Sequence, residues 1–334
     1  MIISRTPFRV SFFGGGTDYP KWYEEHKGAV LATTIDKYCY ITCRHLPPFF
    51  GHKSRIIYSI IEHVEKNIDE IKHPAVREVL RFLNIHEGIE IHHDGDLPAR
   101  TGLGSSSAFT VGLLNGLYAL KGIMATEDRL AREAIFVEQK KCKDNVGCQD
   151  QTLAAYGGFN YIEFGGVNHL KVKKVTIGPE RLKFLQDHLM LFFTGFSRMA
   201  SEIAAHQIKN IPKKTKELKA MQQMVTRAAD ILNSKEDVNN FGKLLHESWK
   251  LKRTLSDRIT TSFIDDLYTE ARHAGATGGK LLGAGGGGFF LLFARPKDQK
   301  KIRTRLKKLL EIPFRFENLG SQIIFYQPNS GKVV

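Results

Sequence analysis

The sequence has few cysteines and no long apolar run. It holds four cysteines, and no two of them form the C-x-x-C pair that a zinc knuckle or a thioredoxin-like site would need. The longest apolar run, Phe289 to Ala294, is far shorter than the roughly 20 residues of a membrane-spanning helix. Arg5, Pro7 and Arg9 interrupt the stretch where a signal peptide would carry its apolar core. These features favour a cytoplasmic protein with reduced thiols and no membrane association.

Several common motifs are also missing. The P-loop string G-x-x-x-x-G-K-[ST] does not occur. The segment from Gly283 to Gly288 fits G-x-G-x-x-G, but it precedes an expected strand, whereas the dinucleotide-binding fingerprint follows a strand and opens a helix. His92, His93 and Asp94 are consecutive, and neighbouring residues of a strand point to opposite faces, so a shared metal ion is disfavoured.

Positive charge is in clear excess. The 334 residues include 49 Lys+Arg against 35 Asp+Glu, for a formal net charge of +14. Such an excess favours an anionic partner: a nucleic acid, a membrane surface or a phosphorylated small molecule. Much of the charge lies in 209–219 and 297–308, where helical spacing predicts solvated faces. No aromatic-interleaved basic stripe or helix-turn-helix signal occurs, so nucleic-acid binding is a minor alternative and we expect none.

The order of expected elements indicates an α+β protein in two parts. Stretches rich in β-branched and aromatic residues predict strands at 9–13, 30–44, 55–61, 88–93, 158–164, 168–177 and 189–194. Helices are expected over 105–120 and 126–141, which begin at serine and threonine, good capping residues. The pattern is then helical from 200 to about 274, with breaks near 212, 233–234 and 260–262. A strand at 289–293, a basic helix at 298–310 and a last strand at 322–327 follow, and a domain boundary is expected between 180 and 200.

Three glycine-rich segments are the strongest candidates for function: Gly14–Tyr19, Pro98–Ala108 and Gly278–Gly288. In the middle one, Gly102 and Gly104 allow positive φ angles and close approach of a ligand to the backbone. The helix expected to begin near Ser105 offers free N–H groups and the positive end of its dipole. Together these features predict an anion site suited to phosphates, although a tight turn with an ordinary N-cap would look the same.

Two acidic residues stand between the second and third glycine segments. Glu138 lies late in an expected helix, and Asp150 lies in a polar, glycine-bearing stretch before a helix of small residues. A carboxylate beside a phosphate site suits either Mg²⁺ ligation or acceptance of a hydroxyl proton. Either residue alone would be read as a surface acid, so the interpretation rests on its combination with the glycine segments.

These segments, in this order and spacing, resemble the motifs of the GHMP kinase superfamily, which includes galactokinase, homoserine kinase, mevalonate kinase and phosphomevalonate kinase. The stretch Thr6–Tyr19 resembles the first family motif, Pro98–Ala108 the nucleotide phosphate loop, and Lys280–Gly288 the third motif. The resemblance covers nearly the whole chain. It implies a two-domain α+β fold, with an N-terminal ATP- and substrate-binding domain similar to a ribosomal-protein domain (1–190) and a ferredoxin-like C-terminal domain (191–334).

The resemblance also implies roles for individual residues. ATP would bind across Gly102, Leu103, Gly104, Ser105, Ser106 and Ser107. Mg²⁺ would be held by Ser106 and Glu138. Asp150 would be the catalytic carboxylate, and Arg9 would stabilise charge around the attacking oxygen.

The acceptor pocket differs from that of galactokinases. Residues implied to bind the substrate are Asp18, Gly15, Gly16, Gly285 and Gly286. Galactokinases carry Glu-His where this chain has Gly15-Gly16, which implies a roomier pocket or one that reads its ligand through backbone N–H groups. This G-G-G-T-D form is similar to the bacterial kinases of D-glycero-D-manno-heptose 7-phosphate. The resemblance therefore implies ATP-dependent phosphorylation of that sugar's anomeric hydroxyl to the 1,7-bisphosphate, toward nucleotide-activated heptose.

Several alternatives stay open at this point. The acceptor could be an unphosphorylated sugar such as fucose or galactose, or the chain could be a catalytically silent sugar sensor on the same scaffold. The presence of Ser106, Glu138 and Asp150 argues against a sensor, which need not keep a metal site. The residues that would bind a sugar's own phosphate are undecided among Arg5, Lys21, Arg198 and Lys280, and the oligomeric state is open.

Overall fold

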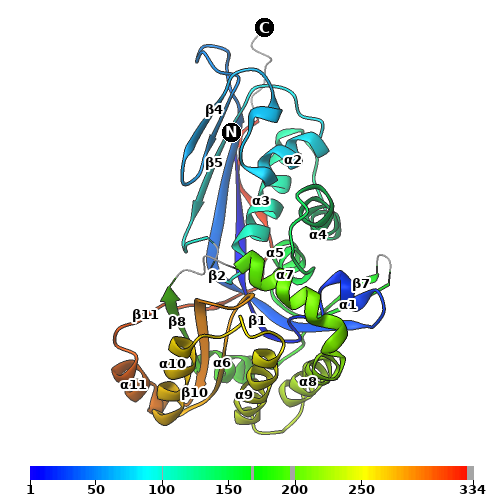
Figure 1. Ribbon diagram of the computed structural model, residues 1–334. Coiled ribbons are helices and arrows are strands. Elements are labelled where there is room, and N and C mark those ends of the chain that lie inside the picture. The colour runs from blue at the N-terminus through cyan, green and yellow to red at the C-terminus, as the bar shows by residue number, and fades with distance from the viewer. Residues whose placement is uncertain (100, 167–168, 196–199, 329–334) are drawn as a thin grey trace.

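Two β-sheets, each covered by helices, build the molecule (Figure 1). The structure is a computed structural model and describes residues 1–99, 101–166, 169–195 and 200–328. Within these ranges, no helix is both long enough and apolar enough to cross a membrane.

The first sheet has the order β13-β1-β2-β5-β3-β4, with β6 and β12 also paired to β2, and β7 paired to β6. Its two long central strands, β1 (Ile2–Phe13) and β2 (Gly28–His45), run antiparallel, with Arg9 opposite Thr34. The other strands are β3 (Ser54–Ile57), β4 (Ile61–Val64), β5 (Ile89–Gly95), β6 (Phe159–Gly165), β7 (His169–Lys174), β12 (Phe316–Glu317) and β13 (Gln322–Tyr326). Val10 and Phe12 of β1 are fully buried in the core, so register along this strand is fixed by packing.

Helices cover one face of this sheet, as Figure 1 shows: α2 (Pro74–Phe82), α3 (Ser105–Leu120), α4 (Glu127–Phe136) and α5 (Gln149–Tyr156). Every residue of α3 from Ser107 to Ala119 is buried, in keeping with its apolar composition. The Thr126 hydroxyl accepts a hydrogen bond from the Arg129 N–H and caps α4. The helix continues as a π-helical turn, Val137–Lys141, which carries Glu138. Short helices at Pro20–Tyr23 (α1) and Ile68–Glu70 lie elsewhere in this half.

The second sheet is ferredoxin-like. Its order is β11-β8-β10-β9, from strands β8 (Leu189–Gly195), β9 (Ala276–Leu281), β10 (Gly288–Ala294) and β11 (Leu310–Glu311). Helices separate β8 from β9, and α11 (Pro296–Arg305) separates β10 from β11, which gives the split βαβ topology of ferredoxin-like domains. The intervening helices are α7 (Ala200–Asn210), α8 (Thr215–Asn233), α9 (Asn239–Thr254) and α10 (Ser262–His273), with a 3₁₀ turn at Ile211–Lys213; α6 (Pro179–Asp187) precedes β8. The two-domain α+β prediction is confirmed.

Five features differ from the sequence-based expectations. The strand expected at 55–61 is the β3–β4 hairpin, because residues 58–60 form a bend. The glycine-rich stretch before residue 282 is a strand, β9, and the basic helix expected to reach 310 ends at Arg305. Helices α2 and α6 had not been anticipated. The last strand, β13, pairs with β1 of the first sheet, so the chain does not end inside the second unit. The boundary at residue 190 itself stays a prediction.

Candidate active site

An ion pair between Arg9 and Asp150 lies at the centre of the site. The Arg9 Nε donates to Asp150 Oδ1 and its Nη2 to Oδ2, both at 2.7 Å. The pair is held from the strand side by β1 and from the helix side by the first turn of α5. The Arg9 side chain is 5% exposed and that of Asp150 is 25% exposed, so only the carboxylate is open to a ligand. A bidentate pair of this kind fixes the orientation of both groups.

The loop before α3 lies directly against this ion pair. Arg9 Nη1 donates to the Gly102 carbonyl at 2.6 Å, and the Arg9 N–H donates to the Leu103 carbonyl at 3.0 Å. Gly104 precedes α3 with a φ of +74°, and a Cβ placed on it would lie 3.4 Å from Asp150 Cγ. Asp150 is therefore adjacent to the first turn of α3, whose backbone N–H groups are suited to phosphate oxygens.

The third glycine segment packs against the same loop. A Cβ on Gly102, whose φ is +85°, would lie 2.5 Å from the Leu282 carbonyl oxygen. A Cβ on Gly283 would lie 2.5 Å from the Gly102 Cα. The segment turns next against the loop at Ile259, whose carbonyl accepts from the Gly286 N–H at 2.9 Å. Backbone-to-backbone contact this close requires glycine, and it joins the second domain to the phosphate loop of the first.

Glu138 is a buried carboxylate behind the start of α3. Its Oε2 accepts from the Ser107 hydroxyl at 2.9 Å and from the Gln151 side-chain amide. Its Oε1 is buried and has no hydrogen-bond partner among the described residues. Burial raises the pKa of Glu138 to about 7, and the nearby side chains of Thr110, Ser107 and Gln151 oppose this shift. An unpartnered, buried carboxylate oxygen is a suitable ligand for a hard cation.

Asp18 occupies the turn that follows β1. Its Oδ1 accepts from the Gly16 N–H at 2.9 Å, and its carbonyl accepts from the Cys148 N–H at 3.0 Å. A Cβ on Gly147 would lie 1.9 Å from Asp18 Oδ2, so the two loops are in direct contact. Burial raises the pKa of Asp18, the Gly16 N–H opposes this shift, and the nearby charge of Asp150 adds to it.

Two buried lysines from the second domain complete the site. The Lys252 Nζ, from α9, donates to the Gly283 carbonyl at 2.6 Å and to the Leu281 carbonyl at 3.2 Å. The Lys280 Nζ, from β9, donates to the Phe12 carbonyl at 2.9 Å. Burial lowers the pKa of Lys252 to about 8, and burial together with the charge of Lys252 lowers that of Lys280 well below its usual value.

Both lysines lie close enough to the charged residues of the site for the charges to interact. The pKa of Lys252 responds to the charges of Arg9, Asp18 and Asp150, and that of Lys280 responds to Arg9 and Asp18. Three basic side chains and two carboxylates thus share one buried region between the domains. Such a region favours an anionic ligand, because charges there are poorly screened by solvent.

Comparison with known families identifies this architecture. The family model described as "GHMP kinases N terminal domain" matches residues 57–158, and the one described as "GHMP kinases C terminal" matches residues 228–312. The chain belongs to the GHMP kinase superfamily. It is accordingly an ATP-dependent phosphotransferase with an alcohol acceptor.

Three relatives show where this GHMP kinase stands among known proteins. It is 28% identical to D-glycero-alpha-D-manno-heptose 7-phosphate kinase of Campylobacter jejuni, over 92% of this chain and 93% of that protein. It is 26% identical to the bifunctional fucokinase/GDP-fucose pyrophosphorylase of Arabidopsis thaliana, over 93% of this chain but only 32% of that protein. A D-glycero-D-manno-heptose 1-phosphate kinase structure from Bacteroides thetaiotaomicron shares the fold, with a TM-score of 0.79 at 23% identity, over 96% of this chain and 98% of that one.

The structure brings most of the expected site residues together. Arg9, Asp150, Asp18 and the 102–107 loop converge, while Gly285 and Gly286 lie on the adjoining loop. One detail differs: the hydroxyl that contacts Glu138 belongs to Ser107, whereas Ser106 is exposed. The metal role of Ser106 and the other individual roles stay predictions.

The cations considered for binding a sugar's own phosphate lie in different parts of the structure. Lys280 belongs to the site, whereas Lys21 is exposed on α1 and the Arg5 guanidinium stacks over the Tyr38 ring, 4.6 Å from its centroid. Arg198 lies outside the described residues. Lys252 was missed from the sequence, although it carries a usable signal: it follows Phe241, Leu245 and Trp249 on the buried face of α9, where an unpaired lysine is unusual.

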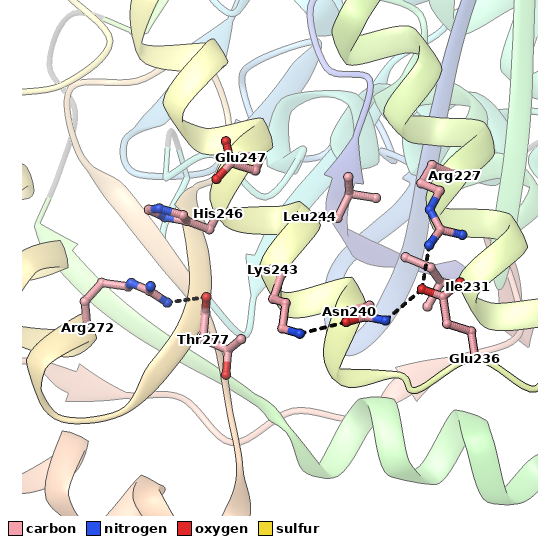
Figure 2. Close-up of a pocket in the computed structure, with 10 residues that line it drawn as sticks. All are labelled: Arg227, Ile231, Glu236, Asn240, Lys243, Leu244, His246, Glu247, Arg272 and Thr277. Carbon is pink, nitrogen blue, oxygen red and sulfur yellow. Dashed lines mark hydrogen bonds and ion pairs between the residues drawn. The ribbon is translucent and has the colours of Figure 1, made fainter.

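A separate cavity of about 720 Å³ lies outside this site, between α8, α9 and β9 (Figure 2). Figure 2 shows Arg227 and Glu236 directed at one another at one end and Arg272 directed at Thr277 at the other. None of its lining residues is among the site residues described above. The cations there are largely engaged within the protein, so the cavity carries no part of the kinase assignment.

Proposed function

We propose that this GHMP kinase transfers the γ-phosphoryl group of ATP to the anomeric hydroxyl of D-glycero-α-D-manno-heptose 7-phosphate. The anomeric oxygen bonds to the γ-phosphorus as the bond from that phosphorus to the β–γ bridging oxygen breaks, and ADP leaves. The products are the 1,7-bisphosphate, ADP and the proton released from the anomeric hydroxyl, and the reaction lies on a route to nucleotide-activated heptose in the cytoplasm.

The observation that carries the choice of a phosphorylated acceptor is the pair of buried lysines, Lys252 and Lys280. A neutral sugar would gain little from two buried basic groups, whereas a bound sugar phosphate would supply negative charge that favours their protonated forms. The similarity to the Campylobacter jejuni enzyme over nearly its full length supports the same choice.

The reacting groups follow from the geometry. The backbone N–H groups in the first turn of α3 hold the ATP phosphates. Asp150 accepts the hydrogen bond of the attacking hydroxyl and directs its oxygen at the γ-phosphorus, since each carboxylate oxygen keeps a lone pair beyond its bond to Arg9. The Arg9 guanidinium, paired with this carboxylate, supplies positive charge close to the attacking oxygen.

Mg²⁺ is the metal that fits the residues present. The unpartnered Glu138 Oε1 supplies a hard oxygen ligand, and the exposed Ser106 hydroxyl can supply a second. When bound, Mg²⁺ would offset the negative charge of the phosphate oxygens. The Ser107 and Gln151 side chains fix the orientation of the Glu138 carboxylate toward this position.

A kinase for an unphosphorylated sugar is the second candidate, and the fucokinase relative favours it. A panel of heptose 7-phosphate, hexose 6-phosphates, fucose and galactose, each with ATP and Mg²⁺, separates the two. The proposal predicts the highest kcat/KM for heptose 7-phosphate. Preference for a free hexose would refute the phosphorylated acceptor, and no turnover on any sugar would favour the sensor.

A further inference from the structure

Cys148 places a buried thiol two residues before Asp150, at the entry to α5. The Gln139 side-chain amide donates a hydrogen bond to its sulfur at 3.3 Å, and the Tyr23 hydroxyl lies 3.2 Å from the same sulfur. Burial raises the pKa of this thiol to about 12, so it stays protonated near neutral pH and is a poor nucleophile. Its contacts, and not its reactivity, are therefore the feature to explain.

The two partners of this sulfur belong to segments that carry the other two carboxylates of the site. Gln139 directly follows Glu138 in the π-helical turn. Tyr23 ends α1, a single turn that begins two residues after Asp18. The Cys148 N–H also donates to the Asp18 carbonyl at 3.0 Å. One residue thus joins the three segments that supply the site carboxylates.

The loop between Gln139 and Cys148 is held by further hydrogen bonds. The Gln139 amide also donates to the Val146 carbonyl at 3.1 Å. The Thr152 hydroxyl donates to the Cys148 carbonyl at 2.7 Å and so ties the end of the loop to α5. The ion pair described above fixes the carboxylate of Asp150, whereas these hydrogen bonds fix the backbone from which that side chain extends.

We propose that Cys148 is a positioning residue, which sets the place of the Asp150 carboxylate relative to Glu138 through the contacts at its sulfur. This inference rests on the proposed kinase function and adds a residue that acts through Asp150. The reacting atoms must lie in line within narrow limits, and a displacement of about 1 Å can cost about 10² in rate. Alanine at this position offers no hydrogen-bonding atom, whereas a serine hydroxyl can both donate and accept, as the thiol can.

The first test compares Cys148→Ala with Cys43→Ala, using the acceptor that the wild-type enzyme phosphorylates best in the panel above. Cys43 is the matched control, because it is fully buried in the core of the first sheet and burial alone raises the pKa of its thiol. We expect Cys148→Ala to lower kcat about three- to tenfold beyond the control, with the KM for ATP unchanged. Cys148→Ser should keep kcat within about twofold of wild type. Equal kcat values for Cys148→Ala and Cys43→Ala would overturn the proposal.

The second test is a double-mutant cycle with Asp150→Asn. If Cys148 acts through Asp150, Cys148→Ala should change kcat by less than about twofold once the carboxylate has been removed. A purely structural role would lower kcat by the same factor in both backgrounds, and that result would overturn the proposal.

Tyr23→Phe provides the test if Cys148→Ala folds poorly, because it removes one hydrogen-bonding partner of the sulfur without leaving a cavity. We expect a kcat about two- to threefold below wild type with an unchanged KM for ATP. Wild-type kcat in this variant would overturn the positioning role and leave the kinase assignment intact. A wild-type enzyme that phosphorylates no sugar would overturn the proposed function and this inference together.

Discussion

Both carboxylate oxygens of Asp150 accept hydrogen bonds from the guanidinium of Arg9, across 141 residues of sequence. The pair joins the central strand of the first sheet to the start of α5, and the phosphate loop packs on it through Gly102 and Gly104. In the proposed reaction, the acceptor and the donor would both be positioned around this single contact.

Removing the charge of Asp150 should separate catalysis from nucleotide binding. Asp150→Asn keeps the shape of the side chain but weakens the hydrogen bond to the attacking hydroxyl and the pairing with Arg9. We expect kcat to fall by at least about 10² while ATP affinity stays nearly unchanged, measured by steady-state kinetics and nucleotide titration. Asp144→Asn, an exposed acid on the loop before α5, is the control. Wild-type turnover in Asp150→Asn would exclude a catalytic role for this carboxylate.

The contact between Gly102 and the third glycine segment should be essential for ATP binding. Gly102→Ala adds a Cβ 2.5 Å from the Leu282 carbonyl oxygen at a φ of +85°, so one of the two loops must move. We expect a KM for ATP raised at least about tenfold and a lower melting temperature. Gly122→Ala has a comparable φ of +72° but nothing within 4 Å, so it reports the backbone strain alone. Equal effects of the two substitutions would show that the contact itself is unimportant.

Glu138 should make the metal-free protein less stable at alkaline pH. Burial raises its pKa from 4.5 to about 7, so the folded state keeps a proton that the unfolded chain releases. The stability from this group is complete below pH 4.5 and is lost as the pH rises through about 7. Glu138→Gln stays neutral, so its stability advantage over wild type should grow by about 2–3 kcal/mol between roughly pH 5 and pH 8. Urea unfolding in the presence of a chelator measures this difference in the free energy of unfolding, with the exposed Glu25→Gln as control. A difference between variant and wild type that does not change with pH would contradict the prediction.

Lys252 should make acceptor binding depend on pH. Burial lowers its pKa to about 8, so the ammonium group is charged below that pH and neutral above it. The KM for a sugar phosphate should therefore rise as the pH passes about 8, while the KM for a free sugar stays flat. Lys252→Met should abolish this pH response and lower kcat/KM for the sugar phosphate about ten- to hundredfold. Lys250→Met, an exposed lysine on the same helix, should change neither value. An equal loss for both kinds of acceptor would assign Lys252 a purely structural role.

The sequence alone predicted those features that depend on residues close together in the chain. The start of α3 at Ser105 and the cap of α4 at Thr126 were predicted because serine, threonine and glycine act on the backbone next to them. The order of the three glycine segments indicated the family, and the structure brings the phosphate loop and the third segment into contact.

The parts that were missed depend on contacts between distant residues. The return of β13 to β1 is a pairing across the whole chain, which no local pattern specifies. The proximity of Lys252 to Arg9 and Asp18 depends on how α9 packs across the domain interface.

The central claim is transfer of phosphate from ATP to the anomeric oxygen of heptose 7-phosphate. Phosphorus NMR of the product from these two substrates reports both the acceptor and the position of the new bond. The account predicts a new phosphate resonance coupled to the anomeric proton, together with the retained 7-phosphate signal and ADP. A product phosphorylated at another position, or ATP left intact with heptose 7-phosphate while a free hexose is phosphorylated, would contradict it.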